Sequence, residues 1–333
     1  MPLSFLSFDI LRLSIDIPPV NPVTPFFQHQ GVLVLDGGLA TELEARGCDL
    51  NDDLWSARTL LENPDLIRDV HLDYLHAGAD CIASATYQAT FEGLAQRGLD
   101  REQAGELLRS SVRLAMAARD AFWSAPEHRQ HRLRPLVAAS VGPYGAFLAD
   151  GSEYTGRYGL DRAALSAFHR DRWHVLAESG ADLMACETIP AHVEARVLLQ
   201  LLRETPGTYA WFSFSCRDGG RLSDGTPLAD VAAELHEEPQ IVAVGINCTS
   251  PRFIPNLIAE VRRSTAKPII VYPNSGEVYD ARSKRWAGTA NPVDFGQSSG
   301  EWLAAGATLI GGCCRTGPGH VRAIREQLCV RRT

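Results

Sequence analysis

The residues best suited to chemistry in this sequence are three of its eight cysteines. Cys313 and Cys314 are adjacent and follow two glycines, whereas Cys248 ends a separate apolar run. Thiolates are favoured ligands of zinc, which binds them at about 2.3 Å in tetrahedral geometry and keeps one position open in catalytic sites. We therefore interpret Cys248, Cys313 and Cys314 as three ligands of a zinc ion whose fourth position is left for water or substrate.

Two other interpretations of these cysteines have to be weighed. A buried cysteine on its own usually behaves as a small hydrophobic residue. A vicinal disulfide between Cys313 and Cys314 would close a strained eight-membered ring. The grouping of three thiols favours the metal site over both. A structural role is assigned to the other five, of which Cys216 could border the site: Cys48, Cys81, Cys186, Cys216 and Cys329.

Carboxylates and other polar residues also follow short apolar runs. Asp36 precedes two glycines, where it could either cap the next helix or contact a ligand. Glu187 follows the run Leu183–Cys186, and two carboxylates in one place would suit an amino group on a substrate. The other polar residues in equivalent positions are Thr86, Tyr144, Cys216 or Arg217, Asn247, and Asn274 with Glu277.

The apolar runs alternate with segments of helical periodicity, which predicts repeated βα units. We expect eight strands, at Gly31–Leu35, Cys81–Ser84, Leu136–Val141, Leu183–Cys186, Tyr209–Ser215, Ile241–Ile246, Ile269–Tyr272 and Thr308–Ile310. Eight units without a long linker favour an α/β fold with a single (β/α)8 TIM-type barrel. A doubly wound sheet would want a G-x-G-x-x-G turn after the first strand, which is missing. In a barrel, the polar residues above would share the rim at the carboxyl ends of the strands.

Glycine and asparagine mark the expected helix boundaries. Gly78, Gly180 and Gly306 each lie between a helical segment and a strand, and we expect each to close its helix in the left-handed conformation. Asn63 and Asn291 are each followed by proline, a pattern typical of a capped helix start.

Composition disfavours several classes of function. The chain has 32 basic and 40 acidic residues, and its net charge of −8 argues against nucleic-acid binding because phosphate contacts need excess Lys and Arg. No apolar run approaches the roughly 20 residues that cross a bilayer, so no membrane partner is expected. Cysteines without framework spacing suit a reducing compartment, which predicts a cytoplasmic protein. Residues 1–30, with four prolines at 18–25, are expected to form a poorly ordered extension, and residues 31–333 the barrel domain.

Taken together, these motifs resemble the zinc-dependent homocysteine S-methyltransferases from about Val32 to Ile324. The resemblance rests on five segments in order: Asp36–Glu42, Thr86–Thr90, Glu187–Pro190, Gly245–Cys248 and Gly311–Arg315. Two further segments, Ser140–Ala146 and Ala149–Tyr154, resemble the short members of the family that take a methyl group from S-methylmethionine or S-adenosylmethionine.

The resemblance implies that Zn²⁺ is held by the three cysteines and that homocysteine and a sulfonium donor are the small-molecule partners. It places the amino-acid part of homocysteine at Asp36, Thr86 and Glu187. Further substrate contacts are expected at Gly38, Asn247 and Tyr144. Either Tyr144 or one of the Trp residues could shelter the sulfonium of the donor by a cation–π contact. Two alternatives stay open: the same site could methylate selenocysteine or another thiol, or the chain could bind zinc without catalysis.

Overall fold

Eight parallel strands form the centre of the molecule in the computed structural model, which describes residues 20–48, 56–280, 285–287 and 291–329. The strands are β1 (Leu33–Val34), β2 (Cys81–Ala83), β3 (Leu136–Val141), β4 (Leu183–Ile189), β5 (Ala210–Phe214), β6 (Ile241–Asn247), β7 (Ile269–Tyr272) and β10 (Ala307–Ile310). Their spatial order is β1-β10-β7-β6-β5-β4-β3-β2, and a parallel bridge between Leu35 and Cys81 joins the two ends. The sheet thereby closes into the predicted (β/α)8 barrel.

Each predicted strand is found within a few residues of its expected bounds, and the largest difference is in β4. This strand runs on to Ile189, past the expected end at Cys186. Its register against β5 shifts between Cys186 and Ile189, and Thr188 has a positive φ of 59°. Such an irregularity turns side chains out of the normal alternation, and it does so at Glu187, one of the predicted site residues.

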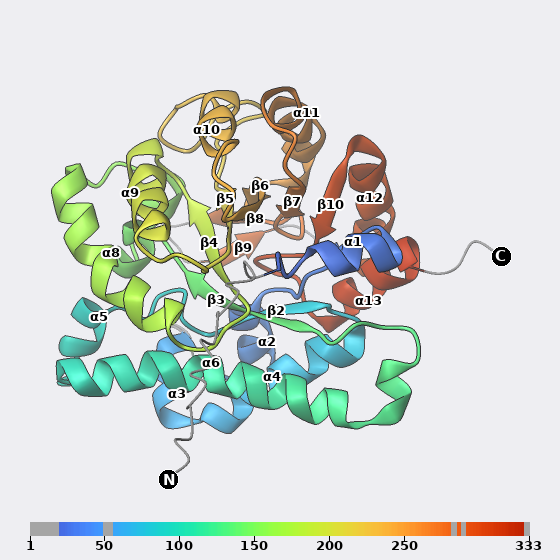
Figure 1. The fold of residues 1–333 in the computed structure, drawn as a ribbon, viewed down its shortest axis with the longest axis horizontal. Helices are drawn as coiled ribbons and strands as arrows, with labels where there is room; N and C mark the ends of the chain where they lie inside the picture. The colour runs from blue at the N-terminus through green and yellow to red at the C-terminus, as the bar shows by residue number, and fades with distance from the viewer. Residues whose placement is uncertain (1–19, 49–55, 281–284, 288–290, 330–333) are drawn as a thin grey trace, which may run out of the picture.

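Helices surround the strands, as Figure 1 shows. They are α2 (Leu39–Ala45), α3 (Ser56–Glu62), α4 (Pro64–Ala77), α5 (Phe91–Ala95), α6 (Arg101–Ser124), α7 (Tyr144–Leu148), α8 (Arg162–Ala177), α9 (His192–Arg203), α10 (Leu228–Leu235), α11 (Ile254–Ser264), α12 (Pro292–Ala305) and α13 (Pro318–Cys329). Short 3-10 turns lie at η1 (Pro126–Arg129), η2 (Ser152–Tyr154) and η3 (Pro251–Phe253), and a hairpin of β8 (Val278–Asp280) and β9 (Arg285–Ala287) follows β7. Among the described residues, no helix is both long and apolar enough to cross a bilayer.

The predicted helix boundaries are largely present. Gly78 and Gly306 end α4 and α12 in the left-handed conformation, with φ of 118° and 114°. Gly180 also has a positive φ, but the cap of α8 is Glu178. The side chain of Asn291 caps α12 through Val293 N, whereas Asn63 makes no side-chain cap at α4.

The segment before β1 differs from the expected poorly ordered extension over residues 24–30, which form helix α1 (Thr24–Gln30), the blue helix in Figure 1. Pro25 lies in its first turn, where proline favours a helix, and Gly31 ends it with φ of 79°. Val23 and Phe26 are 1% and 2% exposed and join the apolar cluster inside the barrel. Helix α1 therefore packs against the barrel, and residues 1–19 lie outside the described part of the chain.

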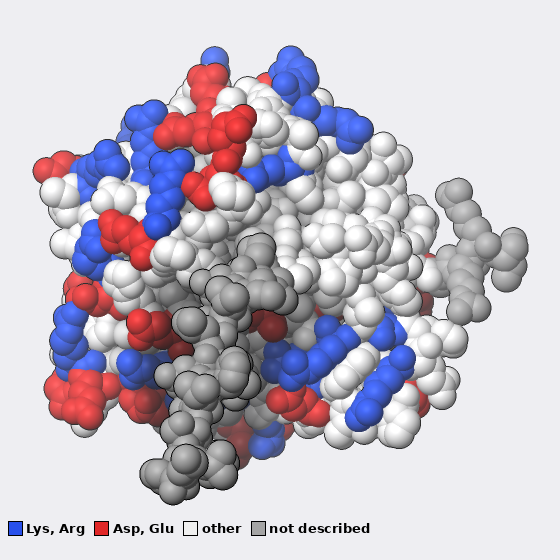
Figure 2. Space-filling model, in the orientation of Figure 1, with Lys and Arg blue, Asp and Glu red and all other residues white. Residues whose placement is uncertain are grey.

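The outer surface carries mixed charge. On the face in Figure 2, Lys and Arg lie among Asp and Glu at the top, along the left side and in the lower part, whereas the right-hand side above these is largely free of charged residues. Several of these groups form exposed pairs between neighbouring helices, such as Arg170 with Glu204 and Arg196 with Glu234. Exposed pairs of this kind contribute roughly 0–1 kcal/mol each, so the buried apolar side chains of the strands and helices dominate the stability of the fold.

Candidate metal and substrate site

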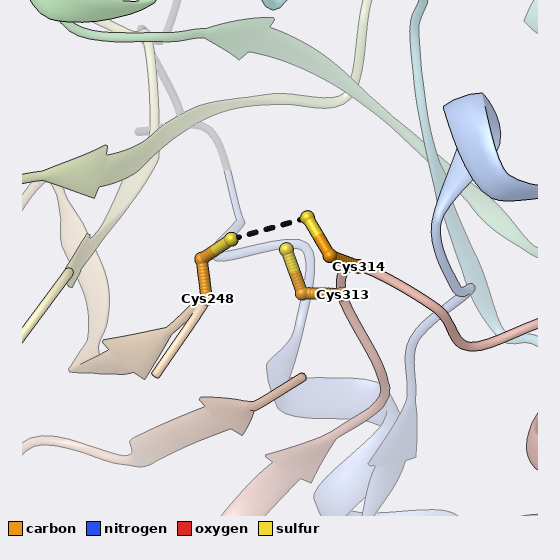
Figure 3. Close-up of side chains that lie close together, drawn as sticks. All are labelled: Cys248, Cys313 and Cys314. Atoms are coloured by element: carbon orange, nitrogen blue, oxygen red, sulfur yellow. Dashed lines mark hydrogen bonds between the residues drawn. The ribbon is translucent and has the colours of Figure 1, made fainter. Parts of the chain in front are cut away.

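The three predicted thiols meet at the carboxyl ends of β6 and β10. Cys248 follows β6, and Cys313 and Cys314 follow β10, so that the side chains converge as Figure 3 shows. The sulfur atoms lie within 4.8 Å of one another, and the Sγ atoms of Cys248 and Cys314 are 3.4 Å apart. Residues distant in the chain thus form one cluster of sulfur ligands.

Backbone contacts fix the positions of these cysteines. The amide of Cys248 donates to Tyr272 O at 3.2 Å, and the amide of Cys313 donates to Pro273 O at 2.9 Å. Cys248 has a positive φ of 48°, an uncommon conformation that turns its side chain away from the strand direction. Gly311 lets the chain pass close to β1, because a Cβ at this position would lie 2.5 Å from Leu35 Cβ. The sequence Gly-Gly-Cys-Cys is therefore needed for the thiols to reach the cluster.

The thiol cluster fits a zinc ion. Sulfur atoms bound to one tetrahedral zinc at about 2.3 Å lie roughly 3.8 Å apart, which falls between the shortest separation of 3.4 Å and the 4.8 Å limit of the cluster. Hydrogen bonds from Cys248 and Cys313 hold the pKa of Cys314 well below its usual value. Hydrogen bonds with Cys248 and Cys314 raise the pKa of Cys313 instead. The neighbouring thiols can stabilise one thiolate, at Cys314. For all three cysteines to be ionised at the same time, a bound cation is needed.

A cavity that is partly open to solvent lies beside the thiols at the carboxyl-terminal end of the barrel. It is lined by Asp36, Gly37, Gly38, Leu39, Ala40, Thr41, Ala83, Ser84, Ala85, Tyr87, Gln88, Ser140, Glu153, Tyr154, Glu187, Thr188, Cys248, Tyr272, Gly312, Cys313 and Cys314. These described lining residues include three carboxylates and three thiols but no Lys, Arg or His. Such a cavity suits a positively charged ligand better than an anionic one.

Asp36 and Glu187 form an acidic pair in this cavity. Burial raises the pKa of Asp36, against the hydrogen bond that Ala83 N donates to it at 2.8 Å, and the charge of Glu187 raises it further. Burial raises the pKa of Glu187 to about 7, against hydrogen bonds from Ser140 and Tyr272. Two partly exposed carboxylates whose pKa values are both raised would gain from a nearby cationic group.

Comparison with known proteins identifies the family. The model of the homocysteine S-methyltransferase family matches residues 33–328. Homocysteine S-methyltransferase YbgG of Bacillus subtilis is 54% identical over 305 residues, which is 92% of this chain and 97% of that protein. The chain belongs to the homocysteine S-methyltransferase family. It is a methyltransferase that acts on small molecules, and the alternative of a zinc-binding protein without catalysis is not supported.

Two other members of the homocysteine S-methyltransferase family are informative. One is homocysteine methyltransferase MmuM from Escherichia coli, whose crystal structure in the metallated form has a TM-score of 0.82 to this structure. The two sequences are 48% identical, and the match covers 92% of this chain and 100% of the MmuM chain. Selenocysteine Se-methyltransferase of Brassica oleracea var. italica is 50% identical, covering 91% of this chain and 90% of that protein.

Several predicted substrate residues of this homocysteine S-methyltransferase line the cavity, and others support it from behind. Asp36, Gly38 and Glu187 line it directly. The buried Thr86 donates through Oγ1 to Ser140 O at 2.7 Å and does not line the cavity. Buried Asn247 donates to Thr188 Oγ1 at 2.7 Å and points its Nδ2 at Cys313 Sγ, 4.0 Å away.

Tyr144 lies outside the cavity, contrary to the predicted donor contact. Its ring packs against the rings of Phe147, Tyr158 and Phe168, with centroids 4.9–5.6 Å away. Its amide donates to Glu194 at 2.6 Å, so the residue anchors the start of α7. Cys216, Arg217, Asn274 and Glu277 do not line the cavity either.

Sequence reasoning missed the aromatic and acidic residues that complete the cavity. Tyr87 follows β2 and Tyr154 ends η2, with its hydroxyl 3.2 Å from Cys248 Sγ. Glu153 precedes Tyr154 and also lines the cavity. All three lie in segments noted for their resemblance to the family, but no local pattern indicated that their side chains turn toward the cysteines.

Proposed function

We propose that this homocysteine S-methyltransferase transfers a methyl group from a sulfonium donor, S-methylmethionine or S-adenosylmethionine, to the thiol of homocysteine. The observation that carries the proposal is the meeting of Cys248, Cys313 and Cys314 in an acidic cavity without a basic lining residue. Both expected substrates carry a positive charge, an ammonium on homocysteine and a sulfonium on the donor.

Zinc is the proposed metal, with the three cysteines as its ligands. When bound there, zinc would lower the pKa of the homocysteine thiol, so that the nucleophilic thiolate is present near neutral pH. Tyr154 contributes a hydroxyl next to Cys248, and Asn247 contributes an amide near Cys313. These groups orient the sulfurs and temper their charge, as partners of metal ligands commonly do.

The acidic pair is proposed to hold homocysteine. Asp36 and Glu187 would bind its ammonium group, and Ser140, held on one side by Thr86, would keep Glu187 in place. Gly38 lets the cavity wall pack closely on the backbone of Cys313, because a Cβ there would lie 2.6 Å from Cys313 O. The amino-acid part of the substrate is thereby placed so that its thiol reaches the three cysteines.

The proposed reaction is a direct displacement at the methyl carbon. The homocysteine sulfur forms a bond to the methyl group, the bond from that carbon to the donor sulfur breaks with its electron pair, and the thiol proton passes to solvent. The departing thioether is neutral and needs no general acid. Holding the two sulfurs and the carbon near a line supplies part of the rate enhancement. The product is methionine, which places the enzyme in methionine biosynthesis.

The test combines metal analysis with product analysis. Cys248→Ala, Cys313→Ala and Cys314→Ala should each lose bound zinc and reduce methionine formation at least about a thousandfold. Cys216→Ala is the matched control, because this cysteine lies outside the cluster, and it should keep both. Stoichiometric zinc in all three cluster variants would overturn the proposed metal site.

A second thiol or selenol substrate is favoured by one finding, the 50% identity to Selenocysteine Se-methyltransferase of Brassica oleracea. A panel of homocysteine, selenocysteine and cysteine with S-methylmethionine would rank them by kcat/KM. We expect homocysteine to rank first. We also propose a cytoplasmic location, because the eight cysteines are all free and the reaction requires them reduced.

A further inference from the structure

Glu153 is a third carboxylate in the cavity, and it lies apart from the acidic pair of Asp36 and Glu187. It belongs to η2 (Ser152–Tyr154), whereas the acidic pair lies at the ends of β1 and β4. The residue is 6% exposed, and its Oε2 is buried without a hydrogen-bond partner among the described residues. A buried carboxylate oxygen without a partner is costly, and it indicates a ligand group that is to be supplied from outside the chain.

The surroundings of Glu153 point to the kind of group that it receives. Tyr87, Glu153 and Tyr154 all line the cavity beside the three cysteines. Tyr154 directly follows Glu153 in the chain, and its hydroxyl lies 3.2 Å from Cys248 Sγ. Glu153 therefore shares the cavity wall with two aromatic residues and with the cysteine cluster. Carboxylates and aromatic faces together bind cations that have no hydrogen to donate.

The position of Glu153 is set by buried contacts. Its carbonyl oxygen accepts a hydrogen bond from Ser215 Oγ at 2.8 Å, and Ser215 in turn lies 2.9 Å from Ser223 Oγ. The chain at Ser152 packs directly on Gly145, where a Cβ would come within 2.6 Å of Ser152 C. The missing hydrogen-bond partner is thus a property of a packed segment.

We infer that Glu153, together with the rings of Tyr87 and Tyr154, forms the subsite for the sulfonium group of the methyl donor. This inference rests on the proposed function. It assigns the two cationic groups to separate carboxylates: the ammonium of homocysteine to Asp36 and Glu187, and the sulfonium to Glu153. A sulfonium has no N–H or O–H to donate, so charge and ring faces are the means by which a protein can select it over a neutral thioether.

The charge of the donor disappears during the reaction, and this gives the subsite a distinctive signature. The sulfonium sulfur becomes neutral as the methyl group leaves, so Glu153 attracts the bound donor more strongly than the transition state. An interaction that is stronger in the ground state than in the transition state lowers KM and also lowers kcat, so its loss should raise KM without reducing kcat. The neutral thioether product loses the attraction and can leave.

The experiment is steady-state kinetics of the zinc-loaded enzyme with S-methylmethionine at saturating homocysteine. Glu153→Gln should raise the KM for S-methylmethionine about tenfold or more, because one charge interaction is lost in a site shielded from water. The kcat should not fall, and the KM for homocysteine and the zinc content should stay within about twofold. The inhibition constant of methionine, the neutral counterpart of the donor, should also stay unchanged when measured against S-methylmethionine.

Two further variants separate charge from shape. Glu153→Asp keeps the charge and should recover most of the donor affinity. Asp150→Asn is the matched control, because Asp150 is an exposed carboxylate three residues away that only accepts from Ser152 N. It should change none of these constants.

Three results would overturn the inference. The first is an unchanged KM for S-methylmethionine in Glu153→Gln. The second is a rise in the inhibition constant of methionine in this variant that equals the rise in the KM for S-methylmethionine. The third is a KM for S-methylmethionine in Glu153→Asp that is as high as in Glu153→Gln. The absence of methyl transfer in the unmodified enzyme is a different result. It would remove the proposed function, and the inference with it.

Discussion

Buried charge is handled in opposite ways at the two ends of the barrel. At the amino-terminal end, Asp80 is fully buried and accepts hydrogen bonds from Arg325 at 2.8 Å, Arg132 at 3.2 Å, Gln30 at 2.6 Å and Val34 N at 3.1 Å. At the carboxyl-terminal end, one carboxylate oxygen of Glu153 has no partner in the part of the chain that the structure describes. Both carboxylates cost free energy to bury, and for Asp80 that cost is offset by the partners named above.

The difference teaches which buried charges serve the fold and which serve a ligand. Asp80 ties together α1, the start of β2 and α13 through the partners that surround it. Glu153, Asp36 and Glu187 have pKa values raised by burial, which means that the fold leaves them short of compensating groups. A site that is incomplete without its ligand is what a binding cavity requires.

Metal removal should have the largest effect on the carboxyl-terminal end. Treatment with a zinc chelator should reduce methyl transfer at least about a thousandfold, because the homocysteine thiol is then mostly protonated near neutral pH. Adding zinc back should restore activity, and activity with bound zinc measured by mass spectrometry should rise in parallel. Full activity in metal-free enzyme would contradict the proposed site.

Replacing Asp80 should have the largest effect on the amino-terminal end. Asp80→Ala leaves Arg325 and Arg132 without their carboxylate and should lower the free energy of unfolding by about 3–5 kcal/mol. Urea denaturation measures this loss, and the kcat of the folded enzyme should stay unchanged. The control Glu204→Ala removes an exposed pair with Arg170 and should cost less than about 1 kcal/mol. An equal loss in both variants would remove the contrast between the two ends.

The pH dependence of stability should come from the carboxyl-terminal end. The pKa of Glu187 is raised from 4.5 to about 7 by burial, so the folded protein holds its proton more tightly than the unfolded chain. Its contribution is fully present below about pH 4.5 and is lost as the pH rises through 7. Metal-free enzyme should therefore lose about 1–3 kcal/mol of stability between pH 5 and pH 8. In Glu187→Gln, the free energy of unfolding measured by urea denaturation should depend less on pH. An unchanged pH dependence would show that another group causes it.

The smallest effect is expected for the hydroxyl next to the cysteine cluster. Tyr154→Phe removes the group 3.2 Å from Cys248 Sγ but keeps the ring. Since a single hydrogen bond contributes about 0.5–1.5 kcal/mol, kcat should fall roughly two- to tenfold with zinc retained. A thousandfold loss would instead place Tyr154 among the essential groups.

Much of this organisation was predictable because it depends on local patterns. The eight strands were found within a few residues, since a buried parallel strand is a continuous apolar run that can be recognised by itself. The barrel rule then placed Asp36, Glu187 and the three cysteines on one rim. The order of the strands around the barrel brought Cys248 to Cys313 and Cys314, as predicted.

The errors occurred where a side chain's direction depends on packing. Tyr144 follows β3 as an active-site residue would, but its ring turns into an aromatic cluster behind the cavity. Glu153 and Tyr154, farther along the same connection, line the cavity instead. Residues 24–30 were judged by their prolines, whereas the burial of Phe26 inside the barrel makes them a helix.

The sequence by itself determined the barrel, the thiol cluster and the family, because each depends on residue types in a set order along the chain. Only the tertiary structure decided which side chains reach the cavity and which buried carboxylates lack partners. The physical reason is that hydrogen bonding and burial are properties of a residue's neighbours in space, and for Glu153 and Asp80 those neighbours come from distant parts of the chain.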